Sequence, residues 1–133
     1  MKKTILVILT LGIFALPGYA QAPQYILIDT TMADRAEIEA PSIKDSAGVR
    51  VAIVRLTFVS PQTFKAPLIG VKTLRLLFHV DCANKRAKNM GSHAYDNAGL
   101  KIAMMRDADT EWNAMNGDAR ERLTVQKVCA ISL

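Results

Sequence analysis

Apolar and polar residues alternate most regularly over residues 73–81. One set of alternate positions is apolar throughout: Leu74, Leu76, Phe78 and Val80. The other set is mixed: Arg75, Leu77, His79 and Asp81. Successive side chains of a strand point to opposite faces of its sheet, so this pattern predicts a strand with one buried and one exposed face.

Further apolar runs, separated by turn residues, predict a meander of strands around this one. The runs cover residues 25–30, 38–45, 49–59, 87–95 and 100–106. Turns are expected at residues 46–48, at Asn84-Lys85 and at residues 96–99, with a loop around Phe64 in between. The sequence therefore predicts an antiparallel sheet of about five to six strands.

The C-terminal residues change to a helical pattern. Asp118 has the side chain of a helix N-cap, and Glu121 three residues later completes a capping box. A helix is therefore expected over residues 119–130, with one apolar face docked on the sheet. That face comprises Val125, Val128 and Cys129. The predicted fold class is α+β, with residues 21–133 as a single domain.

The first twenty residues have the features of an export signal. Two lysines precede an apolar stretch over residues 4–16, and the small-residue site Gly18-Tyr19-Ala20 follows. Residues 1–20 are therefore predicted to be a signal peptide cleaved after Ala20, with no transmembrane segment afterwards. The mature protein is expected in the periplasm or outside the cell, and not as a lipoprotein, because no cysteine stands near the cleavage site. Losing the two lysines lowers the formal net charge from +5 to +3.

Cys82 and Cys129 are the only cysteines of the chain. Disulfides form and persist in oxidising compartments, so export predicts that these two residues are bonded. The bond would join the end of a strand to the helix, and closing such a loop stabilises a fold by about 4 kcal/mol on the chain-entropy model. Two free thiols are the alternative.

Two histidines and three methionines raise the question of a copper or haem site, because copper and haem iron both accept imidazole and thioether ligands. These residues are His79, His93, Met90, Met104 and Met105. If Asn84-Lys85 is a two-residue turn, His79 lies opposite Met90, whereas His93 pairs with Leu76 and points to the other face. No metal or cofactor is therefore expected, although a slip of one residue would reunite the histidines.

A basic cluster, formed by Lys85, Arg86 and Lys88, stands near the predicted turn, with Asp81 opposite Lys88. Such clusters are usually hydrated surface, and an acidic polysaccharide or protein patch is the alternative reading. Nucleic acid is not expected as a partner, because the protein is exported and no aromatic platform accompanies the charge. Trp112 is instead expected to fill the gap between helix and sheet.

Two segments, HVDCANKRAKNMGSHAYDNAG and EWNAMNGDARERLTVQKVCA, resemble the pattern of the surface-adhesin protein E family. The matching residues are Asp81, Cys82, Lys85, Arg86, Tyr95, Asp96, Gly99, Trp112, Asp118, Val128 and Cys129. The resemblance implies an antiparallel sheet carrying a C-terminal helix, binding of host matrix proteins at the cell surface, and a homodimer. The family's adhesin is lipid-anchored, and this chain lacks the cysteine that such an anchor needs.

These features predict an exported, non-enzymatic binding protein whose partner is a host matrix or envelope protein. No nucleophile elbow, metalloprotease motif or phosphate loop is present in the sequence. Contact is expected at Arg75, Leu77 and His79, because Leu77 interrupts an otherwise polar face, and at the basic cluster. Two alternatives are a periplasmic inhibitor of an envelope-directed enzyme such as lysozyme, acting through residues 60–67, and a small-ligand carrier, including a haem carrier.

Overall fold

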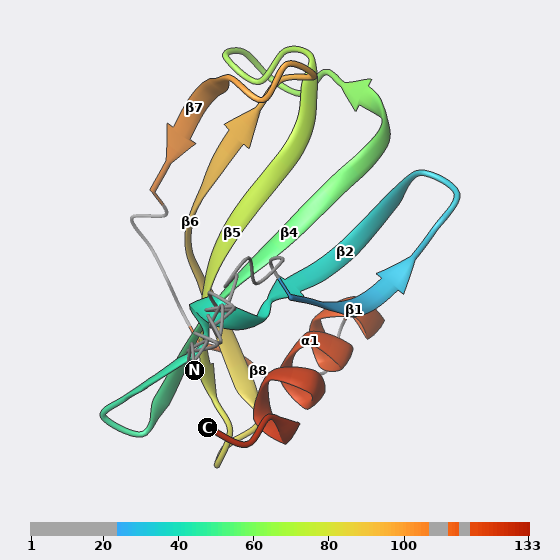
Figure 1. The fold of residues 1–133 in the computed structure, drawn as a ribbon. Helices are drawn as coiled ribbons and strands as arrows, with labels where there is room; N and C mark the ends of the chain where they lie inside the picture. The colour runs from blue at the N-terminus through green and yellow to red at the C-terminus, as the bar shows by residue number, and fades with distance from the viewer. Residues whose placement is uncertain (1–23, 107–111, 115–117) are drawn as a thin grey trace, which may run out of the picture.

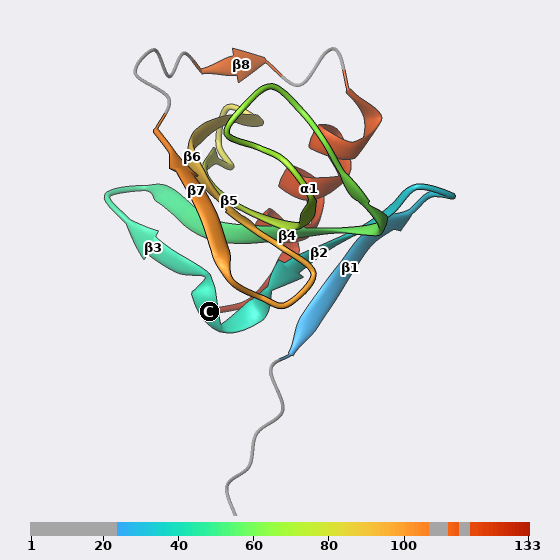
Figure 2. The same cartoon turned by 90° about the horizontal axis from the view of Figure 1, so that it is seen from above.

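The structure, a computed structural model, describes residues 24–106, 112–114 and 118–133. Its elements are β1 (Tyr25–Thr30), β2 (Asp34–Glu39), η1 (Ala40–Ser42), β3 (Lys44–Ser46), β4 (Val49–Gln62), β5 (Val71–Asp81), β6 (Arg86–Tyr95), β7 (Lys101–Met105), β8 (Asn113–Ala114) and α1 (Ala119–Ala130). The antiparallel sheet runs in the order β1-β2-β4-β5-β6-β7, with β3 paired to β4 and β8 to β6 (Figure 1). Helix α1 lies on one side of β4 (Figure 2). The predicted α+β class, antiparallel sheet and C-terminal helix are confirmed.

The described residues form eight strands, more than the five to six expected. Part of the difference lies before β4, where the strand predicted over residues 38–45 is interrupted. Strand β2 begins earlier, at Asp34, and ends at Glu39, and the 3-10 turn η1 separates it from β3. Pro41 lies in this turn and explains the break, because proline has no backbone N–H to donate to a neighbouring strand.

The hairpin between β5 and β6 has a longer turn than predicted. The turn covers residues 82–85, so Asp81 pairs with Arg86 rather than facing Lys88. The Asp81 carboxylate accepts hydrogen bonds from the Asn84 backbone N–H at 3.2 Å and from the Asn84 side chain at 2.8 Å. Aspartate favours turns because its carboxylate accepts hydrogen bonds from backbone N–H groups a few residues later in the chain. Here these bonds stabilise a turn of four residues, where the sequence predicted a turn of two.

A β-bulge at Met90 shifts the register of this hairpin a second time. Phe78 pairs with Asn89 and Leu77 with Gly91, so Met90 has no partner of its own in β5. The Gly91 backbone N–H donates to the Asn89 side-chain oxygen at 2.9 Å, which holds the bulge together. A glycine inside a strand pattern is a sequence signal for such a bulge. The register predicted from the sequence assumed no bulge at Gly91.

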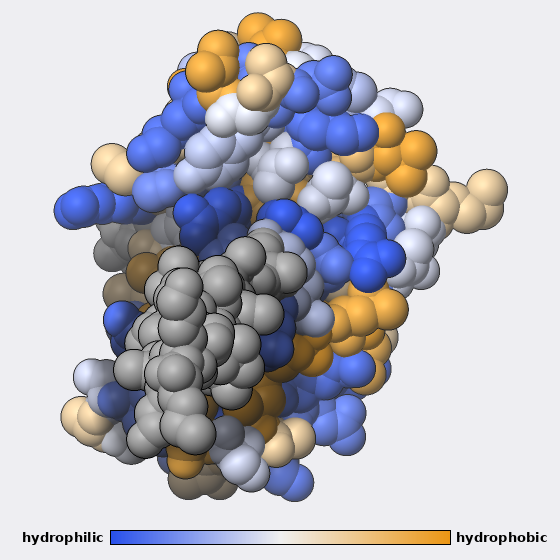
Figure 3. All heavy atoms as spheres, viewed as in Figure 1, coloured by the Kyte–Doolittle hydropathy of each residue, from blue (hydrophilic) through white to orange (hydrophobic). Residues whose placement is uncertain are grey.

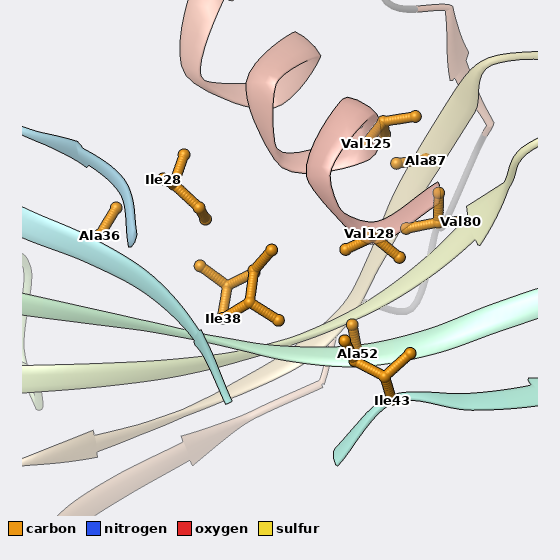
Figure 4. Packing of buried hydrophobic residues seen from close by; sticks show 10 residues of the cluster. Ile28, Ala36, Ile38, Ile43, Ala52, Val80, Ala87, Val125 and Val128 are labelled. Carbon is orange, nitrogen blue, oxygen red and sulfur yellow. The ribbon is translucent and has the colours of Figure 1, made fainter. Parts of the chain in front are cut away.

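The apolar side of α1 is buried against the sheet. Val125 and Val128 point toward Val80 and Ala87 of β5 and β6 (Figure 4). Together these side chains belong to the main buried cluster, whose members are Ile28, Ala36, Ile38, Ile43, Ala52, Val54, Val80, Ala87, Val125 and Val128. The predicted docking face of the helix is therefore confirmed.

The C-terminal end of α1 is attached to the sheet in two ways. The predicted disulfide joins Cys82, just after β5, to Cys129 in the last helical turn. In addition, the Arg50 guanidinium of β4 donates hydrogen bonds to the carbonyl oxygens of Val128 at 2.8 Å and Ile131 at 2.6 Å. Carbonyls at the end of a helix have no partner within the helix, so Arg50 satisfies groups that the fold would otherwise bury unpaired.

The N-terminal end of α1 is attached by charge. Asp118 is the N-cap, as predicted, and its carboxylate accepts from the Arg120 backbone N–H at 2.9 Å. The Arg120 side chain then reaches the first hairpin, where it donates to Asp29 at 2.8 Å and to Asp34 at 2.7 Å. One arginine therefore connects the start of the helix to both β1 and β2.

The predicted signal peptide, residues 1–20, lies outside the described residues. Within the ranges that are described, no helix is both long enough and apolar enough to cross a membrane.

Replacing Arg120 by Gln should destabilise the protein, and more at neutral than at acidic pH. Hydrogen bonds from Arg120 hold the pKa of Asp34 below its ordinary value, against the opposing effect of burial. A lowered carboxyl pKa stabilises the fold above the unfolded-state value of about 4, and this contribution is lost as the pH falls through the folded pKa. Urea denaturation should show a loss of about 2 kcal/mol at pH 7 and a smaller loss at pH 3.

The matched control is Arg122→Gln, because Arg122 is exposed on the same helix. Its free energy of unfolding should stay close to that of the unchanged protein at both pH values. Equal losses in the two variants, or a loss in Arg120→Gln that does not change with pH, would contradict the role of the Arg120 ion pairs.

Candidate functional site

The face of the sheet opposite α1 carries a ladder of paired charges. Arg55 of β4 and Arg75 of β5 are direct cross-strand partners, an arrangement in which like charges repel. Each is neutralised by a carboxylate of β2: Arg55 donates to Glu37 at 2.8 Å, and Arg75 donates to both oxygens of Glu39 at 2.8 and 2.6 Å. The polar positions of the alternating pattern thus form an ordered network on this helix-free face.

Glu37 lies deepest in this ladder, with only 5% of its surface exposed. Burial alone would raise the pKa of Glu37, but hydrogen bonds from Arg55 and Arg35 outweigh it and lower the pKa below its ordinary value. Tyr25 completes the network, because the Arg55 guanidinium lies 3.8 Å from the centre of its ring and donates to its hydroxyl at 2.9 Å. The space-filling view of Figure 3 shows hydrophilic residues across the middle of the molecule on the side seen in Figure 1.

A hollow of about 270 Å³ opens on the same face beside the ladder. We call it the Gly91 hollow, and its lining includes Arg75, Leu77, Met90, Gly91, His93 and Met104. It forms because Leu77 pairs with a residue that has no side chain. A Cβ atom at Gly91 would lie 2.7 Å from the Met105 carbonyl oxygen, and the backbone there has a φ of +144°, so only glycine fits.

The predicted contact residues divide into two groups. Arg75 and Leu77 line the Gly91 hollow, and Leu77 is 36% exposed at its edge. His79 follows on the same face but outside the lining of the hollow, where it pairs with Lys88. The basic cluster lies at the hairpin end of β6, so the structure separates it from the hollow.

Trp112 accompanies the basic cluster, which corrects two expectations. Its ring centre lies 4.8 Å from the Arg86 guanidinium carbon and 4.6 Å from Lys88 Nζ, the geometry of cation–π contacts. The ring therefore stacks on the cations of β6 and does not fill the gap between helix and sheet. An aromatic platform does accompany this charge, although residues far apart in sequence supply the two parts.

The histidines also lie differently from the prediction. Because of the longer turn and the bulge, His93 pairs with Arg75 rather than Leu76, so both histidines point to the helix-free face. His79 and Arg75, the partner of His93, are four positions apart along β5, which corresponds to about 13 Å. Among the residues that the structure describes, no three His, Cys, Asp or Glu side chains group in a way that could hold a metal ion.

A second hollow, of about 770 Å³, lies beside the disulfide. Its lining includes Cys82 and Lys85 from the β5–β6 turn and Leu123, Gln126 and Cys129 from α1. It is more apolar than polar, and no residue predicted from the sequence as a contact lies there except Lys85.

The fold is similar to solved structures, although no protein-family model and no curated protein match the sequence. The crystal structure of protein E from non-typeable Haemophilus influenzae matches with a TM-score of 0.62 and 16% identity, over 86% of this chain and 81% of that one. The chain has the protein E fold.

Two further Haemophilus influenzae protein E structures, crystal form II and a selenomethionine form, match with TM-scores of 0.59 and 0.56. Their identities are 14% and 16%, and each match covers 83% of this chain, with 97% and 93% of the respective protein E chain. The fold implied by the sequence resemblance is therefore confirmed. At such low identity the likeness establishes the protein E fold alone.

Replacing Lys88 by Gln should raise the pKa of His79. Burial is the larger cause of the lowered pKa of His79, and the positive charge of Lys88 across the strand is the second. Removing that charge leaves burial in place, so the pKa should move only part of the way back toward about 6.5. The shift can be followed by NMR titration of the imidazole protons.

The control for this titration is Lys101→Gln, which removes an exposed lysine from β7, where it pairs with Tyr95 and not with the row of His79. It should leave the His79 titration unchanged. An unchanged His79 in Lys88→Gln would contradict the cross-strand contact in the observed register.

Proposed function

We propose that this chain is an exported, non-enzymatic protein that binds another protein through its helix-free face, with Leu77 at the centre of the contact. The observation that carries the proposal is the exposure of Leu77, 36% accessible, at the edge of the Gly91 hollow, where the charge ladder gives way to apolar side chains. Helix α1 packs on the opposite face of the sheet, which leaves this face free of the helix.

The surroundings of Leu77 have the composition of a protein contact. Interfaces are enriched in arginine, methionine and aromatic side chains, and binding energy concentrates in a few residues near their centre. Arg75 is held by its two hydrogen bonds to Glu39, and Arg106 adds an exposed cation at the rim of the hollow. A partner that inserts an apolar side chain into the hollow and places a carboxylate near Arg106 would match this surface.

Export supports the choice of partner. The disulfide between Cys82 and Cys129 suits an oxidising compartment, and the N-terminal sequence has the features of a signal peptide. The partner is therefore a host matrix protein, an envelope protein or a second copy of the chain. Protease shaving of intact cells, followed by blotting, separates these cases, because full protection would eliminate a host protein.

Replacing Leu77 by Asp should weaken binding to the protein partner at least about tenfold, or 1.4 kcal/mol, because it buries an unpaired charge in the contact. Purified wild-type and variant proteins are to be measured by biolayer interferometry against a panel of extracellular-matrix and outer-membrane proteins. Self-association is to be measured in parallel by analytical ultracentrifugation.

The matched control is Leu100→Asp, which changes an equally apolar and more exposed residue, 67% accessible, in the β6–β7 turn. It should bind as the unchanged protein does. If the two variants bind every panel member equally well and keep the same oligomeric state, the helix-free face is not the contact.

A specific observation also favours the inhibitor function as a second candidate. The loop between β4 and β5 exposes Phe64 by 45% and Ile69 by 61%, while the Phe64 ring stays anchored on Phe58 with ring centres 5.8 Å apart. An anchored apolar tip of this kind can enter an enzyme cleft. This function predicts dose-dependent inhibition of lysozyme that Phe64→Ser abolishes and Leu77→Asp does not, and absence of inhibition by the unchanged protein would eliminate it.

A further inference from the structure

Three soft metal ligands come together at the Gly91 hollow: Met90, His93 and Met104 all line it. His93 of β6 and Met104 of β7 are direct cross-strand partners. The Cα atoms of such partners lie about 4.5–5.5 Å apart and their side chains share one face of the sheet. The imidazole and one thioether are therefore neighbours on the helix-free face.

The bulge brings in the second thioether. Met90 and Gly91 together stand opposite Leu77, so the extra residue at position 90 adds a side chain to the lining of the hollow. Without the bulge, Met90 would pair in regular alternation, and His93 would move to the other face. Met105 also lines the hollow, and its carbonyl oxygen lies beside Gly91. Its thioether is not counted as a ligand, because its partner Ser92 is buried on the helix side and the register therefore places the Met105 side chain on that side.

The chemistry of these donors selects the ion. Thioether sulfur is a soft ligand that favours Cu(I), whereas calcium and magnesium require oxygen ligands. Among the described residues that line the hollow there is no carboxylate and no thiolate, and the charged ones are the cations Arg75 and Arg106. A hard divalent cation would find no suitable donor there, while a monovalent soft ion would find three.

We propose that Met90, His93 and Met104 bind one Cu(I) ion at the Gly91 hollow. Methionine has three rotatable side-chain bonds, so both thioethers can turn toward the imidazole without moving the strands. Leu77 and Ile53, which also line the hollow, provide an apolar wall that limits access of water to the ion. Metal binding of this kind goes beyond the protein contact proposed above and does not require it.

The test is a Cu(I) titration of the purified, disulfide-bonded protein under ascorbate, in competition with the chromogenic chelator bathocuproine disulfonate. The expected result is one Cu(I) per chain. Met104→Leu and His93→Gln should each weaken the affinity at least about tenfold. Mutating a residue that only orients a metal ligand already costs about tenfold or more in affinity, so removing the ligand itself should cost at least as much. The Leu variant keeps the apolar volume, so a purely structural role of Met104 would leave the affinity unchanged.

Two matched controls remove the same chemical groups elsewhere. Met32→Leu deletes a thioether that is 99% exposed in the β1–β2 turn, and His79→Gln deletes the other imidazole of the helix-free face. Both should keep the affinity of the unchanged protein. Equal weakening by Met32→Leu and Met104→Leu, or no retention of Cu(I) against the chelator, would overturn the proposal.

A second measurement locates the ion. In protein labelled with ¹³C at the methionine methyl groups, Cu(I) or its redox-inert analogue Ag(I) should shift the Met90 and Met104 signals and leave Met32 in place. Shifts confined to Met32, or spread equally over all methionines, would eliminate the site. The titration and the spectra contain no protein partner, so their outcome is separate from the outcome of the Leu77 experiment.

Discussion

The attachment of helix α1 to one face of the sheet is the constraint on which the rest of the molecule depends. Arg50 and the disulfide hold its C-terminal end, and Arg120 holds its N-terminal end to the first hairpin. The apolar stripe of the helix, formed by Val125 and Val128, is small, and these attachments fix where it packs on the sheet. The helix thereby covers one face of the sheet and leaves the other open to the charge ladder of Arg55, Arg75 and their carboxylate partners.

The open face is stabilised by charge instead of by a second apolar layer. Glu37 is almost fully buried, and an unpaired carboxylate there would be strongly destabilising. Arg35 and Arg55 remove that penalty by donating to both of its oxygens. The resulting ladder keeps the middle of the face polar, which protects an uncovered sheet from nonspecific association, and Leu77 and Leu27 are apolar residues exposed beside it.

One extra residue in β6 changes the chemistry of that neighbourhood. The bulge at Met90 places Gly91 opposite Leu77, which opens the hollow, and moves His93 onto the helix-free face beside Met104. The regular register predicted from the sequence kept the histidines on opposite faces and excluded a shared site. The observed register still keeps His79 away, but it brings an imidazole and two thioethers to one place, an arrangement that no count of residue types could indicate.

Local sequence determined those parts of the protein that depend on neighbours along the chain. Strand β5 was predicted from the alternation over residues 73–81, and helix α1 from the Asp118 cap; both signals lie within the segment that they describe. The disulfide was predicted because the chain has two cysteines and an export signal, which are properties of composition and compartment. Tertiary structure alone decided the register across the β5–β6 hairpin, the position of Trp112 over Arg86, and the arginine attachments of the helix. These depend on which of several near-equal pairings satisfies the most buried polar groups, and that choice involves residues up to 91 positions apart.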